Sequence, residues 1–251
     1  MQLFSGDDIA AGYSAARPAV HPVIVERAFQ RLGAERRRDR ILDVGCGAGA
    51  STRAVAPWAH AVVGVDPEIQ MIRRARAIGG EPGYAVGTAE AMPIASGTVD
   101  RLTAAGALNF VDLGRFRAEA ARVLTADGVI VVYDFATGRR CTDATALEHA
   151  YEAFATRWPR PLDGRHAIDP EVLAVAGFAV VSSEDLMVPI SMNADAYVDY
   201  LMTETNVAAA TRGGARATDV RHWCHDRFSP VFTVPRVIEF DAWFAIVTPA
   251  S

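Results

Sequence analysis

The stretch ILDVGCGAGAST, from Ile41 to Thr52, decides the fold because it joins a hydrophobic run to a glycine-rich turn. Residues 41–45 are expected to form a buried β-strand, and residues 50–56 the helix that follows it. Glycine at positions 45, 47 and 49 permits backbone conformations that other residues disfavour, and it lets a ligand approach the main chain. The N-terminus of the following helix directs its N–H groups toward this turn. The stretch therefore predicts a ligand site at the end of a first strand.

An aspartate at the end of the second expected strand, AVVGV (61–65), indicates what the ligand contains. Asp66 follows Gly45 by 21 residues. An acid at this place in an α/β fold accepts the hydroxyl groups of a ribose. Ligands of open α/β sheets bind outside the carboxyl ends of the strands, so the glycine turn and Asp66 are expected to meet there. The ligand then carries a ribose, with an adenine expected beside it.

Two cofactors satisfy these requirements, a dinucleotide and S-adenosylmethionine. Gly45, Gly47 and Ala50 fit the loose dinucleotide pattern G-x-G-x-x-[GA], which is a weak signal by itself. All 25 basic residues are arginine, so the chain has no lysine. This excludes the lysine of a P-loop and the Schiff-base lysine of pyridoxal-phosphate enzymes. It also counts against an oxidoreductase that uses a catalytic Tyr–Lys pair.

Four motifs in chain order favour S-adenosylmethionine (SAM). They are DVGCGAG (43–49), VVGVDPEIQMI (62–72), GTAEAMPIASGTVD (87–100) and AARVLTADGVIVVYDF (120–135). At normal spacings they resemble the motifs of class I SAM-dependent methyltransferases of the small-molecule type, and they cover residues 39–135. The resemblance implies a Rossmann-like, doubly wound α/β sheet of about seven strands, mostly parallel with an antiparallel last strand, plus a helical lid or cap.

Strand and helix alternate at short period through Phe135, as such a sheet requires. Further strands are expected over 84–86, from 99, and over 128–135, 177–188 and 237–247. Helices are expected over 20–34, 68–77, 113–124, 147–158 and 194–207, with a short helix that Asp169 caps and a loop over 211–219. We expect one methyltransferase domain, 1–251, made of a lid segment (1–34), a SAM-binding core (35–136), substrate-side insertions around strand six (137–236) and a last strand (237–251).

The resemblance also assigns residues to the cofactor. The methionine part is expected at Gly45, Cys46 and Gly47, and the ribose at Asp66, while Asp43 is expected to brace the turn. The rest of the cofactor site is expected to comprise Pro67, Met71, Thr88, Ala89, Glu90 and Ala105. Two departures stand out. Thr88 replaces the acid that often binds the adenine amine, and Asn109-Phe110 replaces a frequent His-Trp pair.

The N-terminal segment FSGDDIAAGYSAARPAVHPVIVERAF (4–29) adds a narrower likeness. It resembles the lead segment of small-molecule methyltransferases, written roughly Y-S-x-x-R-P-x-Y-P. Tyr13, Arg17 and Pro18 match this pattern, and His21 replaces its second tyrosine. Because that segment folds over the cofactor in such enzymes, Tyr13 and Arg17 are expected to bind it, with Arg17 near the methionine carboxylate. An exposed arginine in a turn is the alternative.

Catalysis by such a protein needs few groups, because methyl transfer from a sulfonium is an in-line displacement of aligned partners. A general base is needed only if the nucleophile still carries its proton. The acceptor pocket is expected to include residues 105–110 and the end of the fifth strand. The catalytic candidates are Asn109, His166 and Tyr13; a structural or surface role is the alternative for His166. HWCHD (222–226) lacks the four ligands of structural zinc, so no metal is expected.

Composition sets the remaining bounds. The 251 residues are 51% hydrophobic and 22% charged, which suits a soluble globular protein. The net charge of -5 argues against nucleic acid as a partner. No apolar run approaches the roughly 18 residues of a membrane span, and the acidic N-terminal segment is unlike a signal peptide. Three cysteines suit a reducing compartment.

These observations predict a cytoplasmic monomer or homodimer that transfers a methyl group from SAM to a small-molecule acceptor, without contact to nucleic acid or membrane. The sequence leaves open whether oxygen, nitrogen, sulfur or carbon is methylated. A SAM-binding protein with other chemistry and, more distantly, an NAD-dependent oxidoreductase are the alternatives, because a cofactor motif does not by itself define a reaction.

Overall fold

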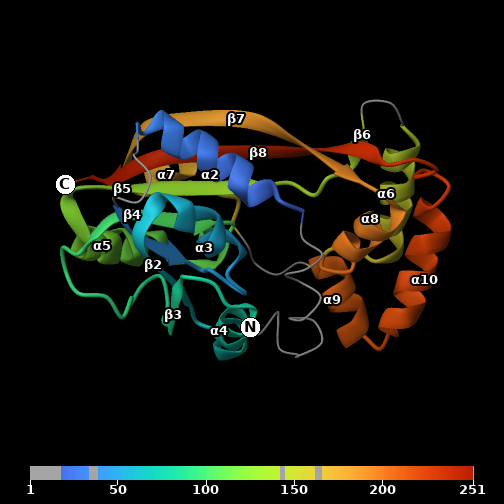
Figure 1. Ribbon diagram of the computed structural model, residues 1–251, viewed down its shortest axis with the longest axis horizontal. Helices are drawn as coiled ribbons and strands as arrows, with labels where there is room; N and C mark the ends of the chain where they lie inside the picture. The colour runs from blue at the N-terminus through green and yellow to red at the C-terminus, as the bar shows by residue number, and fades with distance from the viewer. Residues whose placement is uncertain (1–17, 34–38, 142–144, 162–165, 251) are drawn as a thin grey trace. The chain divides into compact units, whose positions relative to one another are not determined.

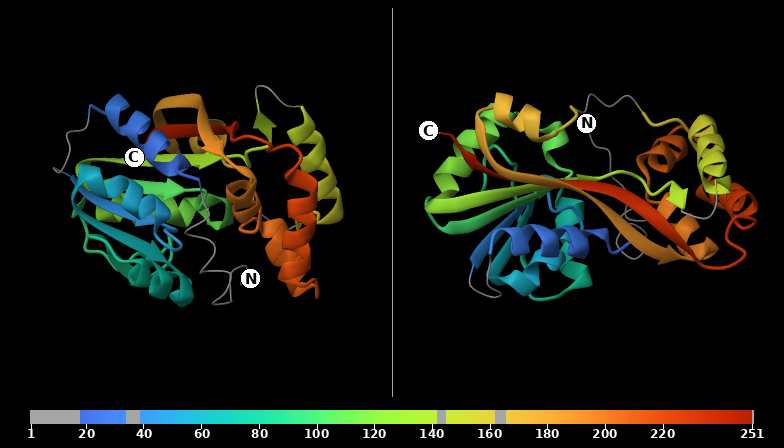
Figure 2. Two further views of the ribbon diagram at one scale, coloured as in Figure 1. Left: turned by 45° about the vertical axis from the view of Figure 1, so that its right-hand side comes forward. Right: turned by 90° about the horizontal axis from the view of Figure 1, so that it is seen from above.

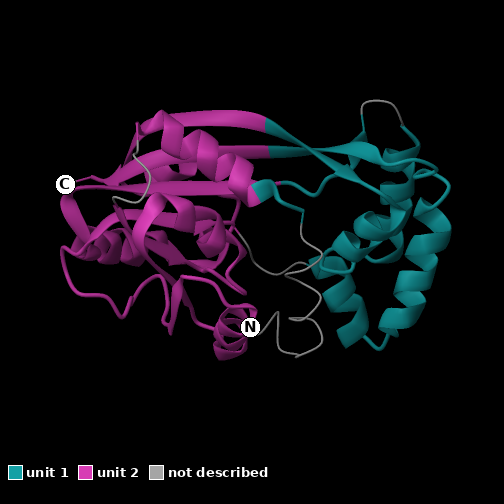
Figure 3. Ribbon diagram, viewed as in Figure 1, with its two compact units in different colours: residues 1–20, 136–163, 187–241 teal, residues 21–135, 164–186, 242–251 magenta. Residues whose placement is uncertain are grey.

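The computed structural model describes residues 18–33, 39–141, 145–161 and 166–250 (Figure 1). The chain divides into two compact units, each assembled from segments that are distant in sequence (Figure 3). Unit 1 comprises residues 1–20, 136–163 and 187–241, and unit 2 comprises residues 21–135, 164–186 and 242–251. The motifs of the glycine turn and of Asp66 therefore lie in unit 2.

Unit 2 is built on the sheet whose strands follow the order β3-β2-β1-β4-β5-β8. Their bounds are β1 (Asp39–Val44), β2 (Ala59–Asp66), β3 (Gly83–Val86), β4 (Val99–Ala105), β5 (Leu124–Phe135) and β8 (Arg236–Pro249). The first five run parallel, and β8 is antiparallel to β5. The order reverses at β1, which has β2 on one side and β4 on the other. This is the place where open α/β sheets bind ligands.

The helices of unit 2 cover both faces of this sheet. Figures 1 and 2 show α2 (Val20–Arg31), α3 (Ala50–Val55) and α4 (Ile69–Ile78) on one face, and α5 (Leu113–Val123) and α7 (Pro170–Val175) on the other. One-turn 3-10 helices occupy Ala56–Trp58 and Leu108–Phe110. The buried stripe of α5, Phe116, Ala120 and Val123, packs on strand residues such as Leu102 and Ile130. Its spacing of three and four residues is the reason the helix was predictable.

The expected fold class is confirmed, since the sheet is mostly parallel with an antiparallel strand at β8. The described residues form eight strands instead of about seven, because β6 (Arg140–Cys141) adds a two-residue pairing to β8. The expected sixth strand is β7 (Phe178–Met192), which also pairs with β8. Both β7 and β8 are longer than expected and contribute residues to each unit.

Unit 1 is mainly helical and has an aromatic core. Its helices are α6 (Ala146–Arg157), α8 (Ala194–Leu201), α9 (Thr205–Arg212) and α10 (Ala217–Phe228). Tyr197 is fully buried between Phe228 and Phe232, with ring centroids 5.2 and 5.0 Å away. Its hydroxyl donates a hydrogen bond of 2.7 Å to the Gly138 carbonyl. This bond ties α8 to the segment that follows β5.

Two expectations for this unit were wrong. The single helix expected over 194–207 is divided into α8 and α9, because the Thr203 hydroxyl bonds back to the Tyr200 carbonyl at 2.7 Å and competes with the helical pattern. Helix α10 begins within the loop expected over 211–219 and was not anticipated. Its buried side chains, Val220, Cys224 and Phe228, form only a narrow stripe, so its helical period was weak in the sequence.

Candidate functional site

The buried carboxylate of Asp43 braces the end of β1. Its Oδ2 accepts hydrogen bonds from Ser51 Oγ and Thr52 Oγ1, both 2.6 Å long. Its Oδ1 accepts one from Thr103 Oγ1 at 2.7 Å. Burial raises the pKa of Asp43, an effect that these three donors only partly offset. One side chain thus links β1, the start of α3 and β4 beneath the glycine turn, which agrees with the bracing role expected of it.

We expect Asp43→Asn to lower the free energy of unfolding by about 1–3 kcal/mol, because an amide NH2 then meets at least one hydroxyl group that now donates. Denaturant unfolding followed by circular dichroism measures this change. The control is Asp127→Asn at an exposed position of β5, where a change within about 0.5 kcal/mol is expected. Equal, small effects at the two positions would contradict the bracing role.

The glycine turn is held against β2 by main-chain hydrogen bonds. The N–H groups of Gly45 and Cys46 both donate to the Val65 carbonyl, at 2.8 and 3.1 Å. Gly45 has a φ of 67° and Gly47 a φ of 51°, in the left-handed region that favours glycine. A Cβ at Gly45 would lie 2.3 Å from the Ala107 Cβ, whereas among the described residues nothing lies within 4 Å of a Cβ at Gly47. With respect to the described residues, the turn is closed at Gly45 and open at Gly47.

Asp66 meets the open side of this turn. Its Oδ2 accepts a hydrogen bond of 2.9 Å from Gly47 N–H, and its Oδ1 accepts one of 2.9 Å from Glu68 N–H. The residue is 8% exposed, and burial raises the pKa of its carboxyl group. A carboxylate offers about four acceptor positions, so these two bonds leave capacity for the hydroxyl groups of a ligand. The expected meeting of the second-strand acid and the glycine turn is therefore observed.

Residues on three segments surround this edge of the sheet. Met71 on α4 and Ala89 after β3 are buried, at 4% and 6% exposure. Pro67 and Thr88 are exposed, and Ala105 at the end of β4 is half-buried. The half-buried Glu90 accepts a hydrogen bond at Oε1 from Asp112 N–H, 3.1 Å long. Each is on the carboxyl side of β2, β3 or β4, so their assignment to the cofactor stays a prediction that this geometry permits.

A second polar group, formed by the side chains of Asn109 and Asp134, lies near the ends of β4 and β5. Asn109 Nδ2 donates to Asp134 Oδ2 at 3.4 Å. The Asn109 carbonyl accepts a hydrogen bond of 3.0 Å from the backbone N–H of His166, whose own side chain is exposed. The glycine at 106 makes room here, because a Cβ would lie 3.0 Å from Asp134 Oδ1. The main chains of two catalytic candidates, Asn109 and His166, are therefore in direct contact.

Tyr133 and His21 form a pair that the sequence did not single out. Tyr133 is fully buried on β5, and its hydroxyl lies 3.0 Å from Nδ1 of His21 on α2. Burial raises the pKa of Tyr133 well above its usual value, so the phenol is neutral. The His21 ring also meets Phe135 edge to face, with centroids 5.2 Å apart. The end of the fifth strand, which includes Tyr133, was expected at the acceptor pocket, and His21 stands where the lead-segment pattern has a tyrosine; nothing in the sequence paired the two.

Proteins named as methyltransferases are similar to this chain in sequence and in fold. Residues 42–132 match the family described as a methyltransferase domain. A methyltransferase of Dictyostelium discoideum is 25% identical over 185 residues, which cover 72% of this chain and 69% of that protein. A ubiquinone biosynthesis O-methyltransferase of Caulobacter is 29% identical, over 66% of this chain and 71% of that protein.

Structural similarity supports the same relation at the level of the fold. The structure of a type II methyltransferase from Anaeromyxobacter dehalogenans superposes with a TM-score of 0.66 at 24% identity, covering 92% of this chain and 96% of that one. The match over residues 42–132, the similar proteins and the shared fold together indicate a class I SAM-dependent methyltransferase. Four further relatives, one from Bacillus subtilis and three from mycobacteria, match over only 42 to 50% of their own length.

The remaining expectations for this methyltransferase have different outcomes. Tyr13 and Arg17 lie outside the described residues. Cys46 is buried in the glycine turn, and burial raises the pKa of its thiol, which disfavours a reactive thiolate. Within the described ranges, no group of three or more His, Cys, Asp or Glu side chains is arranged to hold a metal ion. Among the same residues, none of the helices combines the length and apolar character needed to cross a membrane.

Proposed function

We propose that this methyltransferase binds SAM at the glycine turn and transfers its methyl group to a small-molecule acceptor. The observation that carries the proposal is the Asp66 carboxylate, held at 2.9 Å from Gly47 N–H on the open side of the turn. An acid and a glycine turn in contact at a strand-order reversal form the arrangement that binds a ribose next to a helix N-terminus.

The chemistry of the residues at this edge of the sheet supports SAM as the ligand. Asp66 retains acceptor capacity for the ribose hydroxyls, and the open position at Gly47 lets the methionine part approach the backbone. Met71 and Ala89, which are apolar and lie after β2 and β3, are proposed to contact the adenine ring. Tyr13 and Arg17 are proposed to close over the cofactor. When bound, SAM supplies a methyl group that its sulfonium already activates.

The acceptor is proposed to bind near the polar group at the ends of β4 and β5. A Cβ added at Gly45 would lie 2.3 Å from the Ala107 Cβ, and one added at Gly106 would lie 3.0 Å from Asp134 Oδ1. Because residues 106 and 107 are adjacent in the chain, the glycine turn and this polar group lie near one another within unit 2. Asn109 and Asp134 orient a polar acceptor by hydrogen bonds, and alignment is the main contribution the reaction needs. The neutral Tyr133 phenol orients the His21 ring, which makes His21 a further base for an acceptor that carries a proton. His166 remains the base proposed from the loop before α7.

A small molecule is favoured over nucleic acid as the acceptor because the net charge is -5 and the described units include no separate basic module. The test is calorimetric titration of the full chain with SAM, S-adenosylhomocysteine and NAD. Micromolar binding of the first two and none of NAD is the expected result. Binding of NAD alone would overturn the assignment and favour an oxidoreductase.

Transfer itself is tested with SAM carrying a labelled methyl group and a panel of phenols, carboxylates, amines and thiols. We expect label in one chemical class of acceptor, which would also identify the methylated atom. If SAM binds tightly but none of the classes accepts label, while SAM is consumed in another reaction, the alternative of a non-methyl chemistry is supported instead.

A further inference from the structure

The segment between β3 and β4, residues 87–98, has little regular structure of its own. It contains one isolated bridge, between Thr88 and Ala91, and no helix. The proposed function places the adenine against its first residues, Thr88 to Glu90. Loops of this kind are ordinarily the least stable parts of a fold, and a ligand that must order them loses affinity. The contacts that hold this segment therefore bear on cofactor binding.

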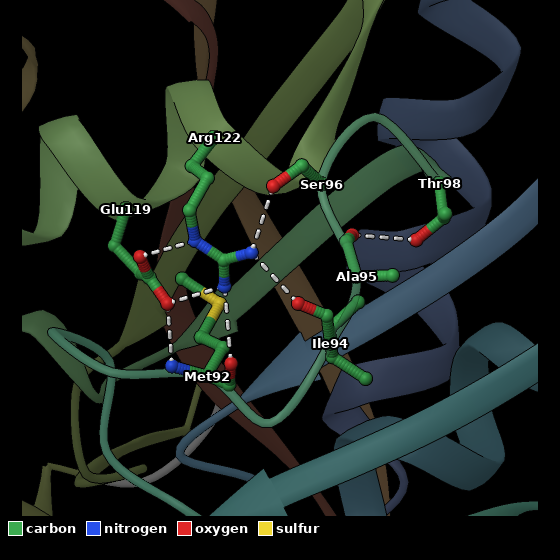
Figure 4. A network of polar contacts seen from close by, with 7 residues as sticks. All are labelled: Met92, Ile94, Ala95, Ser96, Thr98, Glu119 and Arg122. Carbon is green, nitrogen blue, oxygen red and sulfur yellow. Dashed lines mark hydrogen bonds and ion pairs between the residues drawn. The ribbon is translucent and has the colours of Figure 1, made fainter.

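The guanidinium group of Arg122 on α5 is the centre of these contacts (Figure 4). Its Nη1 donates to the Ile94 carbonyl at 2.8 Å and to Ser96 Oγ at 3.2 Å. Its Nη2 donates to the Met92 carbonyl at 3.1 Å. Its Nε and Nη2 also donate to the two oxygens of Glu119, both at 2.7 Å. Together these bonds use all of the N–H donors that a guanidinium possesses.

Glu119 completes the hold on Met92. Its Oε1 accepts a hydrogen bond of 2.7 Å from Met92 N–H, so Met92 is held through both its N–H and its carbonyl. The hydrogen bonds from Arg122 lower the pKa of Glu119, which keeps this carboxylate charged. The Met92 side chain is buried in the core that α5 shares with the sheet. Met92 is thus a fixed point three residues after Ala89.

Other contacts attach the segment to α5 from one end to the other. Glu90 accepts from Asp112 N–H just before the helix, at 3.1 Å. Gly97 N–H donates to the Arg122 carbonyl and Thr98 N–H to the Val123 carbonyl, both at 2.9 Å. The ion pair of Glu119 and Arg122 lies between these ends. The side chains of this ion pair make the hydrogen bonds that attach residues 92–96 to α5.

We propose that Arg122 and Glu119 are positioning residues for the cofactor, which hold residues 87–98 in the ligand-binding conformation before the adenosine part arrives. The proposal rests on the proposed function, because it needs adenosine to bind at Thr88 to Glu90. Neither side chain is among those expected to touch the cofactor. They act by raising the fraction of molecules whose loop is ordered, and the apparent affinity falls in proportion when that fraction falls.

The test is Arg122→Met in the full chain, titrated with S-adenosylhomocysteine well below the unfolding temperature. Methionine keeps an unbranched apolar side chain and removes every donated hydrogen bond. We expect the dissociation constant to rise about tenfold, the change expected when the ordered loop is about one tenth populated. Amide hydrogen exchange at Met92 and its neighbours should accelerate in the free variant and slow again at saturating ligand. A residue that only stabilised the fold would not give this local, ligand-reversible change.

Arg40→Met is the matched control. Arg40 forms an equally direct ion pair, with Nε and Nη2 at 2.9 and 2.8 Å from the two oxygens of Asp100. This pair lies at the start of β1, at the strand end opposite the glycine turn. The control removes the same charge and both side-chain hydrogen bonds of an ion pair, and its affinity for S-adenosylhomocysteine should equal that of the wild type.

The outcomes separate the two proposals. If the wild type does not bind S-adenosylhomocysteine, the proposed function fails, and this inference fails with it. If the wild type binds and Arg122→Met binds equally well, only this inference is overturned. Equal weakening in Arg122→Met and Arg40→Met also overturns it, because the effect then comes from general stability. Should Arg122→Met not fold, Glu119→Gln takes its place, since glutamine keeps the shape and weakens the ion pair.

Discussion

Asp66→Ala is expected to weaken the binding of S-adenosylhomocysteine roughly 10- to 100-fold, the size of losing one or two hydrogen bonds to a charged group. The carboxylate is proposed to accept the ribose hydroxyls. It also accepts the N–H groups of Gly47 and Glu68, so alanine removes the link between the turn and the end of β2 as well. Calorimetry on the full chain measures the change directly.

Glu68→Ala is the matched control for this variant. It removes a neighbouring carboxylate from the same edge of the sheet but keeps the backbone N–H that donates to Asp66. Its affinity should stay within about twofold of the wild type, because no contact of the Glu68 side chain is proposed for the cofactor. Unchanged affinity in Asp66→Ala would show that the ribose is bound elsewhere. Equal losses of affinity in both variants would show that Asp66 contributes only through its negative charge and not through hydrogen bonds to the ribose.

Gly45→Ala is expected to lower the free energy of unfolding by about 2–4 kcal/mol, combining an overpacked contact with a left-handed backbone. The new Cβ would lie 2.3 Å from the Ala107 Cβ. That atom is attached directly to the backbone, so relief requires a shift of the 3-10 segment after β4. Denaturant unfolding gives the magnitude, and SAM binding should be lost or strongly weakened in the same variant.

Gly47→Ala separates the backbone cost from the clash. Its φ of 51° is also left-handed, but within the described residues no atom lies within 4 Å of the added Cβ. We expect a loss of only about 1 kcal/mol in stability, the cost of the left-handed conformation. Cofactor affinity should nevertheless fall, because the methyl group projects into the space proposed for the methionine part. Equal stability in the two variants would refute the close approach of Gly45 to Ala107.

Much of unit 2 was predictable because its signals are local in the chain. The run 41–45, the glycine turn and the stripe on α5 each carry a periodicity or a turn residue that specifies one conformation. The fold class and the family followed from them and are confirmed. The division into α8 and α9, and the helix α10, were missed, because a side-chain hydrogen bond and a narrow apolar stripe leave little trace in the sequence.

The candidate site divides in the same way. The sequence by itself determined that an acid and a glycine turn lie at one edge of the sheet, since both follow strands of a parallel sheet whose carboxyl ends share that edge. Only the tertiary structure decided that Tyr133 meets His21, that Asn109 meets Asp134, and that Arg122 and Glu119 hold the 87–98 segment. The two members of each pair lie on different helices, strands or loops, and the local sequence of one element carries no signal of the other. Their meeting depends on how helices pack against the sheet, which is a property of many weak contacts together and leaves no pattern in any single stretch of the chain.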